Sequence, residues 1–84
     1  MNAINWTTRA ARQLRKLDTN IQKSIVNSVG DLSSMPDCQR VKKLVNHEYQ
    51  YRLRIGDYRV LFDWDGEIKI VEIQEVRKRN ERTY

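Results

Sequence analysis

Three arginines stand where an alternating pattern places them on one face of a hairpin. Arg52 and Arg54 alternate with apolar residues, and Arg59 stands in the next alternating run, after a Gly56–Asp57 turn. Successive side chains of a strand point to opposite faces, so these guanidinium groups are expected to share one surface. A guanidinium donates two parallel hydrogen bonds to a phosphate group, whereas like charges on neighbouring strands repel each other. The pattern therefore predicts a surface that binds phosphate.

The alternative is a solvated basic surface whose arginines pair with acidic neighbours. The acidic candidates are Asp63, Glu67, Glu72 and Glu75. A net charge of +5, from 16 Lys+Arg and 11 Asp+Glu, favours contact with polyanions without requiring it. The residues alone leave both interpretations open.

Other catalytic arrangements have little support in the sequence. His47 is the single histidine and is expected in a connecting segment, so no Ser-His-Asp or Cys-His set can be assembled. Cys38 is the single cysteine, which rules out an intrachain disulfide and argues against a zinc site. No metal-site carboxylate cluster and no glycine-rich phosphate loop are present. We expect neither a metal nor another cofactor.

The sequence also predicts where the protein resides. Its first residues have neither the charged nor the apolar segment of a secretory signal, and no apolar run approaches the roughly 18 residues of a membrane span. A lone cysteine fits a reducing compartment. We therefore expect a cytoplasmic protein without membrane contact.

The N-terminal half predicts a short strand and two helices. Residues 2–6 alternate briefly, and Thr7 or Thr8 can cap the helix that follows. The first helix has apolar residues at helical spacing at Ala10, Leu14 and Leu17. The second has an apolar stripe at Ile21, Ile25, Val29 and Leu32. We expect the two helices to form a hairpin, and residues 36–47 to be a connection.

From Glu48 onward the apolar period changes to two, which predicts three strands. The expected runs are residues 48–55, 58–64 and 67–76. In the first run Tyr49 is expected to face the helices. Asp65–Gly66 predicts a two-residue hairpin turn, and the alternation slips near Val71 and Glu72, which predicts a bulge.

The resulting order is β-α-α-β-β-β, which predicts an α+β fold. An antiparallel sheet then carries a helical hairpin on one face and leaves the other face uncovered. Residues 1–84 are expected to form a single domain. The C-terminal tail is basic, and its cations are expected to fold over the uncovered face; they are Arg77, Lys78, Arg79 and Arg82.

The run from Tyr51 to Phe62, YRLRIGDYRVLF, and the ending KRNERTY resemble the RelE/ParE superfamily of bacterial toxins. The resemblance covers nearly the whole chain in element order, and its specific parts are this hairpin and this tail. It implies a RelE-like toxin that enters the ribosomal A site and cleaves messenger RNA there. In that reaction the ribose 2′-hydroxyl attacks the adjacent phosphate and a 2′,3′-cyclic phosphate results, without a metal.

The same resemblance implies roles for individual residues. The expected catalytic residues are Arg52, Arg59, Arg79 and Tyr84. The expected RNA contacts are Gln50, Arg54, Arg77, Lys78 and Arg82. Gln50 stands where the best-known RelE toxins have a lysine, and arginine stays protonated, so the hairpin offers no evident general base.

The missing lysine keeps two alternatives open. ParE-like members share the fold and poison DNA gyrase, and an inactivated relative would only bind an antitoxin. The expected partners are a RelB-like acidic antitoxin from an adjacent gene, the ribosome and mRNA. Contact with operator DNA is expected only through the antitoxin.

Overall fold

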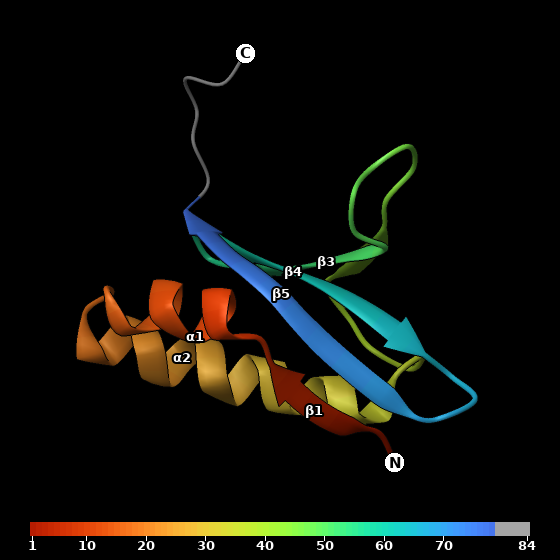
Figure 1. Cartoon of the computed structure of the whole chain (residues 1–84). Helices are drawn as coiled ribbons and strands as arrows, with labels where there is room; N and C mark the ends of the chain where they lie inside the picture. Colours follow the sequence, from red (N-terminus) through yellow and green to blue (C-terminus); the bar gives the residue numbers. More distant parts are fainter. Residues whose placement is uncertain (79–84) are drawn as a thin grey trace.

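The computed structural model of the chain describes residues 1–78, in which two helices lie on one side of a five-stranded sheet (Figure 1). In chain order the elements are β1 (Ala3–Trp6), α1 (Thr8–Arg15), α2 (Thr19–Gly30), the 3-10 turn η1 (Asp31–Ser34), β2 (Val41–Lys43), β3 (Tyr51–Ile55), β4 (Tyr58–Asp65) and β5 (Ile70–Lys78). The predicted α+β fold is confirmed. Neither helix among these residues combines the length and the apolar character that crossing a bilayer requires.

The strand order is β1-β5-β4-β3-β2, and it differs from the predicted sheet in two ways. First, β1 pairs with β5 in parallel, so the sheet is mixed and not wholly antiparallel. The two helices connect β1 to β2, which lies at the opposite edge of the sheet, and the last strand, β5, then pairs with β1. Second, the predicted connection over residues 36–47 contains β2, which pairs antiparallel with β3. Its three residues are too few to show an alternating pattern.

The core forms between α2 and the inner side of the sheet. Thr7 caps α1, as predicted, because its side-chain oxygen accepts a hydrogen bond from the backbone N–H of Ala10. The stripe of α2 is fully buried at Ile25 and Val29. It packs into one cluster with sheet residues that include Leu53, Val60, Phe62, Val71 and Ile73. Burying each such side chain stabilises the fold by about 1.5–3 kcal/mol.

A bulge in β5 determines which residues face outward near its end. Leu61 pairs with Glu75 whereas Phe62 pairs with Ile73, so Gln74 is an extra residue on β5. The phase slip predicted near Val71 and Glu72 therefore occurs two residues later. Because of the extra residue, Glu75 points to the same side of the sheet as Leu61, away from the core.

The two hairpin turns differ in how well the sequence predicted them. Gly56 begins the two-residue turn between β3 and β4 with a φ of 54°, which glycine tolerates without strain. The β4–β5 turn is longer than predicted, because Asp65 pairs with Ile70 and leaves residues 66–69 in the loop. The Asp65 carboxylate accepts hydrogen bonds from the backbone N–H groups of Glu67 and Ile68, which stabilises this wider turn.

A buried asparagine ties the N-terminus to the rest of the fold. The Nδ2 of Asn2 lies 3.3, 3.1 and 3.1 Å from the carbonyl oxygens of Leu32, Ser33 and Met35, and its Oδ1 accepts from Trp64 Nε1 at 3.0 Å. We expect Asn2→Ala to lower the free energy of unfolding by about 1–3 kcal/mol, because these buried groups lose their partner. Urea unfolding followed by tryptophan fluorescence measures the change.

The control is Asn5→Ala, since Asn5 is exposed and makes a single side-chain hydrogen bond, to Glu72, among the described residues. An equal loss of stability in the two variants would contradict the role of Asn2.

Candidate functional site

The face of the sheet opposite the helices, called the open face below, carries a row of three arginines. The register places Arg54 directly opposite Arg59, and Arg59 directly opposite Arg77, across β3, β4 and β5. Their strand neighbours Leu53 and Val60 belong to the core, so alternation directs the arginines to the open face. Paired residues in a sheet have Cβ atoms about 4.5–5.5 Å apart, which brings three positive charges close together.

A second row lies beside the first. Lys42 of β2 pairs with Arg52, Arg52 with Leu61, and Leu61 with Glu75. Arg52 is therefore a diagonal neighbour of Arg59 on the same face, which is the placement that the alternating pattern predicted. Lys42 was missed by the sequence analysis, because its strand is too short to be recognised.

The two central arginines each have a hydrogen-bond donor without a partner. Arg52 and Arg59 are half-buried, and among the described residues the Nε atoms of both are buried and make no hydrogen bond. A buried N–H without a partner costs free energy, which is recovered when the side chain turns so that this N–H meets an acceptor oxygen on the open face. This arrangement suits the oxygens of a phosphate group.

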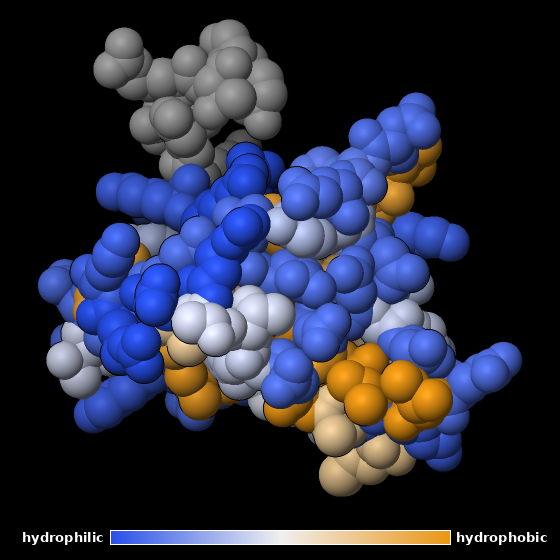
Figure 2. Space-filling model, viewed as in Figure 1, coloured by the Kyte–Doolittle hydropathy of each residue, from blue (hydrophilic) through white to orange (hydrophobic). Residues whose placement is uncertain are grey.

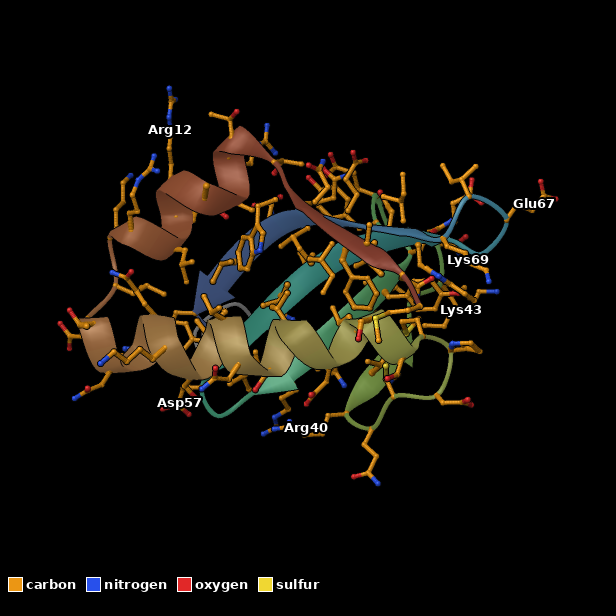
Figure 3. The ribbon with its side chains drawn as sticks, turned by 90° about the horizontal axis from the view of Figure 1, so that it is seen from below. Arg12, Arg40, Lys43, Asp57, Glu67 and Lys69 are labelled. Carbon is orange, nitrogen blue, oxygen red and sulfur yellow. The ribbon has the colours of Figure 1, made fainter. Side chains whose placement is uncertain are left out.

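The acidic neighbours do not neutralise this part of the open face. Within residues 1–78, the ion pairs of Glu75 are to Arg77 and Arg9, and Arg52, Arg54 and Arg59 have none. The carboxylates of Asp63 and Glu72 accept hydrogen bonds from neutral backbone and side-chain amides. Glu67 lies in the β4–β5 turn (Figure 3). For the described residues, the solvated-pair alternative therefore does not hold at Arg52, Arg54 and Arg59.

Glu75 is the one acidic residue that is buried among residues 1–78, with 5% of its surface exposed, and it lies in the open face. Its Oε1 accepts from Arg77 Nε at 2.9 Å and from Gln13 Nε2 at 3.3 Å. Its Oε2 accepts from Arg77 Nη2 at 2.9 Å and from the Tyr49 hydroxyl at 2.9 Å, and Arg9 Nη1 lies 3.6 Å away. The carboxylate therefore joins β5, α1 and the segment before β3.

Burial raises the pKa of Glu75, but the hydrogen bonds from Arg77, Tyr49 and Gln13 outweigh it and lower the pKa from 4.5 to about 2. A lowered folded-state pKa stabilises the protein above the unfolded value, and this stabilisation is lost as the pH falls through the folded value. We expect Glu75 to contribute on the order of 3 kcal/mol at neutral pH.

This contribution should disappear between pH 4.5 and about 2. Urea unfolding at steps across that window measures it. In Glu75→Gln the free energy of unfolding should depend less on pH across this window than in the wild type. Glu72→Gln, which removes an exposed carboxylate of the same strand, should keep the wild-type pH dependence. Parallel pH profiles for the wild type and Glu75→Gln would contradict the assignment.

Tyr49 does not face the helices, and that prediction was wrong. Regular strand pairing of β3 begins at Tyr51, and Tyr49 lies in the preceding loop, where it is buried with its hydroxyl on Glu75. The loop before β3 lies on the side of the sheet opposite the helices (Figure 1), so the alternation of β3 does not continue to Tyr49. The hydrogen bond to Glu75 is the main cause that raises the pKa of Tyr49, so the phenol stays protonated. His47 is exposed, and its Nδ1 accepts the backbone N–H of Tyr49.

Of the remaining predicted site residues, two are described by the structure and three are not. Gln50 is exposed, and its Oε1 accepts the backbone N–H of Trp64, so it lies beside the far end of β4. Lys78 is exposed at the end of β5 and pairs with Tyr58, which packs against the core, so alternation directs it to the helix side of the sheet and not to the open face as predicted. The last three predicted residues, Arg79, Arg82 and Tyr84, lie outside the described residues.

The two ends of the open face carry opposite charges. Next to Gln50 the β4–β5 end forms a groove of about 1010 Å³. Its acidic lining residues are Glu48, Asp63, Asp65, Glu67 and Glu72. Figure 2 shows hydrophilic surface over α1 and the end of β5, and a hydrophobic patch toward the β4–β5 turn, where Met1 and Ile68 are exposed. Among the described residues of the open face, the arginine end therefore attracts a polyanion and the acidic lining of the groove repels it.

Comparison with solved structures shows that this is the fold of RelE toxins. A chain of the RelBE2 toxin–antitoxin complex of Mycobacterium tuberculosis is 34% identical, with a TM-score of 0.80 over 93% of this chain and 98% of that one. The archaeal RelE–RelB complex of Pyrococcus horikoshii gives 21% identity and 0.80, over 95% and 97%. The isolated Escherichia coli RelE toxin gives 18% and 0.81, over 99% and 89%.

The sequence itself agrees with the fold. The family of ParE toxins of type II toxin–antitoxin systems matches residues 4–83. No curated protein sequence matches the chain. The chain belongs to the RelE/ParE superfamily and is a toxin of a type II toxin–antitoxin system.

Proposed function

We propose that this toxin cleaves messenger RNA in the ribosomal A site. The observation that carries the proposal is the pair formed by Arg52 and Arg59, which share the open face without an acidic partner among the described residues and each hold a buried Nε without a hydrogen bond. Phosphoryl transfer builds negative charge on the phosphate oxygens, and fixed guanidinium groups stabilise that charge.

The reaction begins when the ribose 2′-hydroxyl attacks the adjacent phosphorus. The 2′-oxygen loses its proton, the bond from phosphorus to the 5′-oxygen breaks, and the 5′-oxygen gains a proton. The products are a 2′,3′-cyclic phosphate and a 5′-hydroxyl. Arg59 contacts the scissile phosphate, Arg52 a neighbouring phosphate or ribosomal RNA, and the ribosome holds the 2′-hydroxyl in line with the leaving oxygen.

The tail supplies the rest of the proposed site. Arg79 acts on the phosphate or the leaving oxygen, and Tyr84 stacks on a base or orients the nucleophile. RNA contacts run through Arg54 and Arg77 of the arginine row and through Lys78 and Arg82 beyond it. A further contact is the neutral amide of Gln50, which lies at the edge of the acidic groove. The hairpin holds no group that readily accepts the 2′-hydroxyl proton, since Gln50 cannot ionise and the arginines stay protonated. Free RNA is therefore cut slowly, and the ribosome completes the site.

The test is a reconstituted cleavage reaction. Purified toxin is added to ribosomes with a defined codon in the A site, and primer extension maps the cut. The expected result is a cut at that codon with a cyclic phosphate on the upstream fragment, and little cutting of the same mRNA without ribosomes. Intact mRNA on programmed ribosomes would contradict the proposal.

Inhibition of DNA gyrase is the second candidate. It is favoured by the match to ParE toxins and by glutamine at position 50, where RelE toxins have lysine. Induction of the toxin separates the two functions, because gyrase poisoning breaks DNA and induces the DNA-damage response. A prompt stop of protein synthesis with intact DNA supports mRNA cleavage and excludes gyrase poisoning.

We further propose that a RelB-like antitoxin, encoded beside the toxin, neutralises it. The +5 charge and the exposed arginine row suit an acidic segment. Several of the similar solved structures are complexes of a RelE with a RelB. The toxin should copurify with the product of the adjacent reading frame, and operator DNA should bind the toxin only when the antitoxin is present. Separate elution of the two proteins would contradict this partner.

A further inference from the structure

We propose that Glu75 is a positioning residue of the RNA-cleaving site, which fixes the guanidinium of Arg77 beside Arg59 so that both can contact one phosphate. This inference rests on the proposed function. It concerns a carboxylate beside the arginine row, at the end of the open face that is suited to anions.

The geometry of the ion pair supports this role. Arg77 Nε and Nη2 each lie 2.9 Å from a different oxygen of Glu75, so the carboxylate grips one edge of the guanidinium plane. Such a two-point contact fixes the orientation of the plane as well as its position. The side chain of Arg77 remains 47% exposed, so its other edge stays available to a ligand.

The carboxylate is itself held rigidly. Glu75 receives further hydrogen bonds from Gln13 of α1 and from the Tyr49 hydroxyl, and its side chain is 6% exposed. Gln13 is fixed in turn, because its Oε1 accepts the backbone N–H of Val76 at 2.7 Å. Two elements from either side of β5 therefore support Glu75, so Arg77 is oriented before RNA arrives.

The strand register places the oriented Arg77 next to the other arginines of the row. Arg77 lies directly opposite Arg59, and Arg59 directly opposite Arg54. Without a counter-charge, repulsion would turn these flexible side chains away from one another. Glu75 lies one row away, opposite Leu61, where it offsets the repulsion without occupying the space in front of the three guanidinium groups.

A change of charge distinguishes positioning from simple electrostatics. Glu75→Gln removes one negative charge from the open face. Electrostatics alone therefore predicts that the variant binds RNA more tightly than the wild type and cleaves it at least as fast. Positioning predicts slower cleavage by bound toxin, because the Arg77 guanidinium loses its fixed orientation. The two explanations therefore differ in the sign of the effect on kcat.

The experiment measures kcat and KM in the ribosome assay for Glu75→Gln and Glu72→Gln. Glu72 is the matched control, because it lies on the same strand, is exposed, and makes its described hydrogen bonds to Asn5 and Gln74 and not to an arginine. Glu75→Gln should lower kcat by about 10- to 100-fold with KM unchanged or lower, and Glu72→Gln should change neither by more than about twofold. A kcat of Glu75→Gln within about twofold of the wild type overturns the proposal.

A second variant keeps the test valid if Glu75→Gln folds poorly. Arg77→Lys retains the charge and the ion pair with Glu75 but lacks the planar fork, so it should lower kcat by a similar factor. The double variant Glu75→Gln/Arg77→Lys should be no slower than the slower single variant, since both changes remove one arrangement. Effects on kcat that multiply would show that Glu75 does not act through Arg77, which overturns the proposal.

An NMR measurement separates this inference from the proposed function. The Nε–H proton of Arg77 should exchange slowly with water in the wild type and in Glu72→Gln, and quickly in Glu75→Gln. Equal exchange in all three overturns the positioning by Glu75, whether or not the toxin cuts RNA. If the Nε–H of Arg77 exchanges slowly in the wild type but the protein leaves mRNA intact, the positioning of Arg77 by Glu75 is supported. The proposed function is then overturned.

Discussion

Arg59→Ala should lower the rate of A-site cleavage by about 100- to 1,000-fold, the usual cost of removing one fixed donor from a site of developing charge. Arg59 lies at the centre of the arginine row, between Arg54 and Arg77, and its Nε has no partner among the described residues. The loss should appear mainly in kcat, since the neighbouring arginines still attract RNA. Single-turnover cleavage on programmed ribosomes measures it.

The matched control is Arg12→Ala, which removes the same charge from an exposed position. Arg12 lies on α1 and points away from the sheet (Figure 3). It should cut at the wild-type rate within about twofold, apart from a small salt-dependent change in binding. Arg59→Ala should also fold normally, because it relieves repulsion with two adjacent cations. Unchanged cleavage by a folded Arg59→Ala protein would remove the proposed role of this residue.

Phe62→Ala should come close to unfolding the isolated toxin. Phe62 is completely buried at the centre of β4, and removing a buried phenylalanine side chain costs about 3–5 kcal/mol. A chain of 84 residues has a total stability of about 4–13 kcal/mol at the usual stability per residue. Urea unfolding of the purified variant measures the loss.

Bound antitoxin should restore the fold of Phe62→Ala. A partner that binds only the folded state adds about 4 kcal/mol when present at 1,000 times its dissociation constant. The variant should therefore melt cooperatively in the complex and poorly alone. Val45→Ala is the control, because the side chain of Val45 is exposed and its removal should change stability by less than about 0.5 kcal/mol. Equal losses in the two variants would contradict the assignment of the core.

The sequence was sufficient to predict the hairpin and the direction of its arginines. From Tyr51 to Val60 the apolar period of two is interrupted only at a glycine turn, so alternation alone fixed the face of Arg52 and Arg59. The helical stripe at Ile25 and Val29 is equally regular, and both residues are buried as expected.

Other features depend on contacts that a local pattern does not contain. Gln13 and Glu75 are 62 residues apart in sequence, and they meet because α1 packs beside β5. The bulge at Gln74 changes the direction of Glu75, and the loop before β3 brings Tyr49 over it. The parallel pairing of β1 with β5 likewise joins the two ends of the described chain, and no signal within β1 itself indicates it.

The separation of charge along the open face affects how the toxin approaches its target. With cations at one end of the sheet and the acidic groove at the other, the molecule has an electric dipole along the strands. The electric field of a polyanion exerts a torque on this dipole, which turns the arginine end toward the polyanion during diffusion. Encounters are thereby steered toward productive orientations, and the steering weakens as added salt shortens the Debye length.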